Sequence, residues 1–203
     1  MSTCCVIRHA DKLSTNDFYN PLLRHQDQPL SPKGEKDALG LVRYFEGKPI
    51  DAIYVSAYQR TRQTIAPVAV RQGVAPTIDA RLNEIDNGGT EALSDPEIHA
   101  QYPEVWNAFR ERRSDFRFPQ GETGAEAQER IMGFLEEKCQ KHAGDQIVLV
   151  SHDGLIRLLM CAIFKLPVTQ RWNFQVDFCG ITEISYQPEF KDWKLIRFNQ
   201  CYP

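Results

Sequence analysis

The sequence predicts an α/β fold of three layers, in which a mainly parallel central sheet carries helices on both faces. The first observation is a set of three short apolar runs, at residues 4–7, 52–55 and 147–150. Such runs, bounded by polar residues, are typical of strands buried in a parallel sheet. The second observation is that polar residues and then helical patterns follow these runs. Right-handed crossovers would bring the carboxyl ends of parallel strands to one edge of the sheet.

The remaining elements follow from local signals in chain order. Ser31 is a helix N-cap with Pro32 at the first helical position, and Gly47 and Pro49 end that helix. The next helix begins just past Ser56. Later elements are predicted from caps, apolar periodicity and alternation: a strand near 77–79, a helix around 104–113, a helix opened by the capping box at 123–126 and running to about 142, a helix at 155–164, and strands at 180–186 and 193–198.

Two stretches lack a regular pattern. Residues 10–30 are polar and contain Pro21 and Pro29, which predicts a long loop beside the strand ends. Residues 83–121 contain Gly88-Gly89 and three prolines, and this stretch is interpreted as a lid inserted over the carboxyl edge of the sheet. Four arginines of the lid region are interpreted either as solvated charges or as partners for a second anionic group of a ligand: Arg110, Arg112, Arg113 and Arg117.

Length and composition set broad limits on the function. The 203 residues are expected to form a single domain, 1–203, and the net charge of −3 gives no general attraction to nucleic acid or anionic membranes. No apolar run approaches the roughly 18 residues of a membrane span, and no signal peptide is evident. The six cysteines lack zinc-site spacing and are interpreted as reduced, which favours a cytoplasmic setting. The oligomeric state is left open.

The ends of the three apolar runs carry the residues most suited to chemistry. Arg8 and His9 follow the first run, Arg60 lies in the helix after the second, and His152 follows the third. Cations and imidazoles gathered at a strand edge suit an anion, most obviously a phosphate. A neutral imidazole can attack phosphorus, while arginines hold the phosphoryl oxygens. Nothing in this set requires a metal or a cofactor.

The chain resembles the histidine phosphatase superfamily, also called the phosphoglycerate mutase-like family. Six of its motifs occur in the family's order: Arg8-His9-Ala10, Leu30-Ser31-Pro32-Lys33-Gly34, Ser56 to Thr64, Leu82-Asn83-Glu84, Pro119 to Thr123, and Ser151-His152-Asp153-Gly154. The resemblance implies a metal-independent phosphomonoesterase for small phosphate esters. It further implies that His9 is phosphorylated, that Glu84 is the proton donor, and that Arg8, Arg60 and His152 bind phosphate, with His152 counted among the catalytic residues.

Several alternatives remain at this stage. Asp86 and Glu91 are also candidate acids by position, and Asp153 is a rival because another branch of the superfamily has its acid directly after the second histidine. Asp153 and Ala10 replace glycines of the motif, and an inward-pointing Asp153 would repel a phosphate dianion. The alternative functions are a phosphoglycerate mutase, which must keep its phosphoryl group from water, and a catalytically silent phosphate-binding module.

Overall fold

The central sheet has six strands in the order β5-β4-β6-β1-β7-β8. The computed structural model describes residues 2–15, 17–23, 25–190 and 192–202. Four strands are parallel, and β7 and β8 are antiparallel to their neighbours. The strand bounds are β1 Thr3–Arg8, β4 Ala52–Val55, β5 Pro76–Ile78, β6 Gln146–Ser151, β7 Ile181–Gln187 and β8 Asp192–Gln200. The predicted α/β class with a mainly parallel sheet is therefore confirmed.

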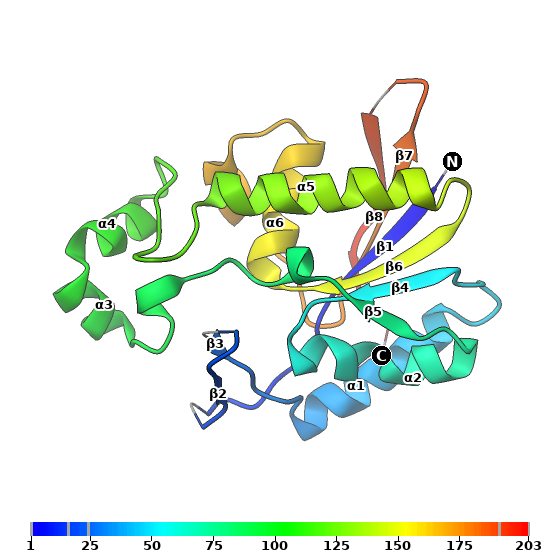
Figure 1. Ribbon diagram of the computed structural model, residues 1–203, viewed down its shortest axis with the longest axis horizontal. Coiled ribbons are helices and arrows are strands. Elements are labelled where there is room, and N and C mark those ends of the chain that lie inside the picture. The colour runs from blue at the N-terminus through cyan, green and yellow to red at the C-terminus, as the bar shows by residue number, and fades with distance from the viewer. Residues whose placement is uncertain (1, 16, 24, 191, 203) are drawn as a thin grey trace.

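Helices cover both faces of the sheet (Figure 1). One face carries α1 (Pro32–Tyr44) and α2 (Gln59–Gln72), and the other carries α5 (Gly124–Lys141) and α6 (Asp153–Ile163). Side chains of β1 alternate between the two faces. Cys4 and Val6 join the core beneath α5 and α6, whereas Cys5 and Ile7 join the core beneath α1 and α2. Both cores therefore help to fix the strand that ends at Arg8.

The predicted helix caps are present in the structure. The Ser31 hydroxyl accepts a hydrogen bond from the Gly34 amide at 3.0 Å, and Pro32 is the first residue of α1. Thr123 and Glu126 form the reciprocal capping box that opens α5. Gly34 also has a packing role, because a Cβ there would lie 2.0 Å from the carbonyl oxygen of Asp11. This close approach explains the glycine of the 30–34 motif.

Some elements differ from those predicted. The stretch 10–30 contains two short paired strands, β2 (Tyr19–Asn20) and β3 (His25–Gln26), which its irregular polarity concealed. The region 83–121 holds α3 (Asp95–Gln101) as well as the expected α4 (Pro103–Glu111), and short 3-10 turns at Ala80–Leu82, Gly88–Thr90 and Val168–Asn173 were not predicted. Helix α2 begins at Gln59 because Tyr58 is still extended.

The lid region projects from one end of the sheet, where α3 and α4 lie apart from the other helices (Figure 1). Its two ends run side by side. The Gly89 amide donates to the Pro119 carbonyl at 2.7 Å, and the Glu122 amide donates to the Asp86 carbonyl at 3.0 Å. Within the described part of the chain, no helix combines the length and apolarity needed to cross a membrane.

Candidate active site

The site forms where β1, β4 and β6 end. Arg8 pairs with Ser151 across the sheet, and Val55 pairs with Val150, so His9, Ser56 and His152 leave the sheet at the same level. A cavity of about 390 Å³ opens there. It is lined by Arg8, His9, Lys12, His25, Gln26, Gln28, Tyr58, Arg60, Glu84, Asn87, Glu91 and Asp153. His152 is fully buried next to it, with its ring centroid 5.1 Å from that of His9.

His9 is held in one tautomer. Its Nδ1 lies 2.8 Å from the carbonyl oxygen of Ala10, which can only accept, so Nδ1 carries the proton and Nε2 has the free lone pair. Burial lowers the pKa of His9 well below its usual value, and the charges of Arg60 and Arg8 lower it further. The imidazole is therefore neutral near pH 7 and can act as a nucleophile through Nε2.

His152 is fixed between Arg60 and Ser56. The Arg60 Nη2 donates to His152 Nδ1 at 3.1 Å, so His152 Nε2 carries the proton and donates to the Ser56 hydroxyl at 2.9 Å. Burial, followed by the charge of Arg60, lowers the pKa of His152 well below its usual value. His152 can donate to a phosphate through Nδ1 when Arg60 releases that atom and a proton moves onto it, either by a change of tautomer or by protonation of the ring.

Arg60 is buried and Arg8 is partly buried, and each has a guanidinium nitrogen that no described residue uses. Arg60 is 6% exposed and packs over the Tyr58 ring at 4.1 Å, while Arg8 packs over the Phe178 ring, also at 4.1 Å. Among the described residues, the buried Nε atoms of both have no hydrogen-bond partner. A buried donor without a partner is uncommon in native proteins, and it indicates room for an anionic ligand.

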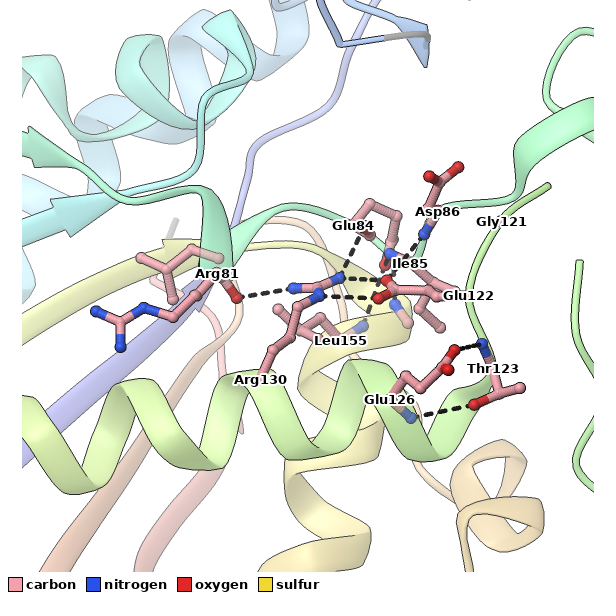
Figure 2. Close-up of polar contacts among 12 residues, drawn as sticks. Arg81, Glu84, Ile85, Asp86, Gly121, Glu122, Thr123, Glu126, Arg130 and Leu155 are labelled. Carbon is pink, nitrogen blue, oxygen red and sulfur yellow. Dashed lines mark hydrogen bonds and ion pairs between the residues drawn. The ribbon is translucent and has the colours of Figure 1, made fainter.

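The side-chain carboxyl group of Glu84 lies against the amino end of α6 (Figure 2). Its Oε1 accepts from the Ile85 and Leu155 amides at 3.0 and 3.1 Å, and its Oε2 accepts from the Gly154 amide at 3.2 Å. A Cβ at Gly154 would lie 2.8 Å from Oε1, which explains the glycine of the 151–154 motif. Burial raises the pKa of Glu84 in spite of the backbone hydrogen bonds that lower it. A raised pKa suits a carboxyl group that must donate a proton.

Asp153 reaches the same cavity but is engaged by cations. Its Oδ1 lies 2.9 Å from Arg157 Nε, one turn further along α6, and 3.8 Å from Arg8 Nη1. The expected repulsion of a phosphate dianion is therefore offset by Arg157. The sequence reasoning did not identify Arg157, although its i,i+4 spacing from Asp153 was a usable signal.

Sequence reasoning also missed a charge cluster at the cavity rim. His25 of β3 lies 3.0 Å from Glu91 through Nδ1 and 3.3 Å from Asp86 through Nε2. Burial lowers the pKa of His25, but the hydrogen bond and charge of Glu91 outweigh burial and leave the pKa raised. These contacts tie the 10–30 stretch to the start of the lid. Asp86 and Glu91 are thus engaged with His25, unlike Glu84.

The lid arginines lie outside this cavity. Arg117 forms an exposed ion pair with Glu126 at 2.5 Å, while Arg110 and Arg112 pack over Trp106 and Trp172. A smaller cavity of about 200 Å³ adjoins Glu84 and Asp153, with walls that include Phe109, Trp172 and Arg157. Among the described residues, no group of three or more His, Cys, Asp or Glu side chains is placed to hold a metal ion.

Comparison with known proteins agrees with this geometry. The family model described as "Histidine phosphatase superfamily (branch 1)" matches residues 4–200. Phosphoserine phosphatase 1 of Hydrogenobacter thermophilus is 30% identical over 175 residues, which cover 85% of this chain and 81% of that protein. A probable phosphoglycerate mutase GpmB of Klebsiella pneumoniae is 32% identical over 167 residues, which cover 79% and 75%.

A solved structure extends the agreement to the fold. Bacillus stearothermophilus YhfR superposes with a TM-score of 0.83 over 97% of this chain and 96% of that one, at 24% identity. At this identity the likeness concerns the fold alone. The family model and the two relatives carry the assignment beyond the fold, since together they cover most of the chain. The chain is therefore an enzyme of the histidine phosphatase superfamily, branch 1.

Proposed function

We propose that this protein is a metal-independent phosphomonoesterase for small phosphate esters, acting through a phosphohistidine intermediate on His9. One observation carries the proposal. The neutral His9 ring has its Nδ1 proton bound to the Ala10 carbonyl and its Nε2 available, in a cavity that Arg8 and Arg60 also line. A nucleophile beside two partly unpaired guanidinium groups is the arrangement that phosphoryl transfer needs.

In the first step, His9 Nε2 attacks phosphorus and the bond from phosphorus to the ester oxygen breaks. Arg8 and Arg60 bind the nonbridging oxygens, where negative charge is spread in the transition state. Glu84 in its protonated form, which burial favours by raising the pKa, gives its proton to the departing alkoxide. The products of this step are the free alcohol, a phosphorylated His9 and an ionised Glu84.

In the second step, water attacks the phosphorus of phosphohistidine. Glu84 now accepts a proton from that water, the phosphorus–nitrogen bond breaks, and inorganic phosphate leaves with His9 neutral again. One carboxyl group thus serves as acid and then as base, so the cycle closes without a further proton donor. Asp153 is the weaker candidate for this role because its carboxylate is paired with Arg157.

The intermediate provides the test. Wild-type protein mixed with p-nitrophenyl [³²P]phosphate and quenched in alkali within milliseconds should retain an acid-labile label on His9. His9→Ala should retain no label and no turnover, whereas His99→Ala, at an exposed position of α3, should label like wild type. Label on a serine or cysteine, or near-normal turnover in His9→Ala, would refute the assignment of the nucleophile.

A second candidate function is a phosphoglycerate mutase, which the similarity to proteins named GpmB favours. A mutase returns the phosphoryl group from histidine to a second hydroxyl of the substrate instead of to water. Incubation with 3-phosphoglycerate separates the two functions, since a mutase yields 2-phosphoglycerate and a phosphatase yields inorganic phosphate. A catalytically silent binding module would turn over neither 3-phosphoglycerate nor p-nitrophenyl phosphate at any pH.

A further inference from the structure

Arg130 makes an unusual set of contacts for a residue that does not line the cavity (Figure 2). It lies on α5, and its guanidinium reaches the chain on either side of Glu84. Nη1 donates to the Arg81 carbonyl at 2.7 Å and Nη2 donates to the Glu84 carbonyl at 3.0 Å. The same group forms a bidentate pair with Glu122, at 2.6 Å through Nη2 and 3.1 Å through Nε.

Glu122 completes the arrangement from the far end of the lid. Its Oε1 accepts from the Asp86 amide at 3.0 Å, and its own amide donates to the Asp86 carbonyl at 3.0 Å. The neighbouring Gly121 allows this approach, because a Cβ there would lie 2.1 Å from the Asp86 carbonyl oxygen. The segment from Arg81 to Asp86 is therefore held at three backbone positions by one ion pair.

We propose that Arg130 and Glu122 are positioning residues for Glu84. The inference rests on the proposed function, in which Glu84 is the proton donor. The Glu84 carboxyl group is bound to amides at the start of α6, but its backbone is placed by Arg130. A proton donor must lie within hydrogen-bond reach of the leaving oxygen, and displacement by about 1 Å can cost as much as 100-fold in rate.

The planar fork of arginine is essential to this arrangement. A lysine ammonium retains the charge but is a point donor, so it cannot span two carbonyl groups and a carboxylate in the same way. The pair is only partly exposed, with side-chain exposures of 21% for Arg130 and 18% for Glu122. Arg130→Lys therefore preserves the charge and changes the geometry of the acid segment.

The leaving group distinguishes positioning from general destabilisation. A stable leaving group such as p-nitrophenolate needs little protonation, whereas the alkoxide from β-glycerophosphate needs a proton donor. Arg130→Lys should lower kcat/KM for β-glycerophosphate at least about tenfold more than for p-nitrophenyl phosphate. The matched control is Glu137→Gln, which removes a different ion pair between α5 and Arg81 and should leave the ratio of the two rates unchanged.

Combination with Glu84→Gln tests whether Arg130 acts through the acid. Once the acid is gone its position is irrelevant. The double variant Arg130→Lys/Glu84→Gln should therefore show the same substrate ratio, meaning kcat/KM for β-glycerophosphate divided by kcat/KM for p-nitrophenyl phosphate, as Glu84→Gln alone. A further fall in the ratio would overturn the proposal. So would equal losses on both substrates in Arg130→Lys.

Glu122→Gln provides a second route if Arg130→Lys fails to fold. It keeps an acceptor for the Asp86 amide, weakens the bond to Arg130, and should reduce the substrate ratio in the same direction. An unchanged ratio in Glu122→Gln would overturn the proposal. If Glu84→Gln itself shows no selective loss, the proton-donor assignment fails and the positioning role fails with it. A selective loss in Glu84→Gln without one in Arg130→Lys or Glu122→Gln overturns the positioning role alone.

Discussion

At the residue scale, the same burial has opposite consequences for the two groups that exchange protons in the proposed reaction. Burial disfavours the charged form of each group, so it lowers the pKa of His9 and raises the pKa of Glu84. His9 stays unprotonated as the pH falls below the usual histidine range. Glu84 stays protonated as the pH rises above the usual carboxyl range. Both functional forms therefore coexist over a wider pH interval than free side chains would allow.

These shifts predict the pH dependence of kcat/KM. With β-glycerophosphate, kcat/KM should fall on the alkaline side as Glu84 loses its proton, and Glu84→Gln should remove that limb. With p-nitrophenyl phosphate the alkaline limb should be much weaker, because that leaving group does not need the proton. Asp153→Asn should keep the limb if Glu84, as proposed, is the proton donor. Loss of the limb in Asp153→Asn and its survival in Glu84→Gln would assign the acid to Asp153.

At the element scale, the loop behind His9 is positioned by the start of α1. Ser31 caps that helix and also donates to the Asp11 carboxylate at 2.6 Å, and the Ser31 amide donates to the Asp11 carbonyl at 3.0 Å. Gly34 lets the helix approach the Asp11 backbone closely. The helix thus fixes the chain two residues beyond the proposed nucleophile.

Gly34→Ala should therefore destabilise the protein. The new Cβ would lie 2.0 Å from the Asp11 carbonyl oxygen, and overpacking of this kind lowers the free energy of unfolding by about 1–3 kcal/mol. Gly133→Ala is the matched control, since Gly133 lies inside α5 with nothing within 4 Å of the added atom. It should raise the free energy of unfolding by about 0.5–1 kcal/mol. Urea unfolding of both variants measures this, and a stabilised Gly34→Ala would contradict the packing argument.

At the scale of the whole molecule, we infer that residues 1–203 form one domain, because the two hydrophobic cores share the strands of one sheet.

The features that could be predicted from the sequence were local ones. Arg8 ends a strand, His9 and His152 directly follow strands, and Arg60 lies at the start of a helix, so their meeting at one edge followed from the parallel topology. Contacts between distant segments carried no such signal. Arg130 reaches Glu84 across 46 positions, and His25 meets Glu91 through a short strand pair hidden in a polar stretch.

The charge of the molecule leads to the last prediction. The chain as a whole has a net charge of −3, so attraction of a phosphate dianion must come from Arg8, Lys12 and Arg60 around the cavity. Two of these are guanidinium groups whose buried Nε atoms have no hydrogen-bond partner within the described part of the chain, and such a set can bind the phosphoryl oxygens without a divalent ion. EDTA should leave kcat/KM for p-nitrophenyl phosphate unchanged. Arg60→Met should raise KM about tenfold or more, and added Mg²⁺ should not restore it. Loss of wild-type activity in EDTA that Mg²⁺ or Zn²⁺ restores would instead place a metal ion in the reaction.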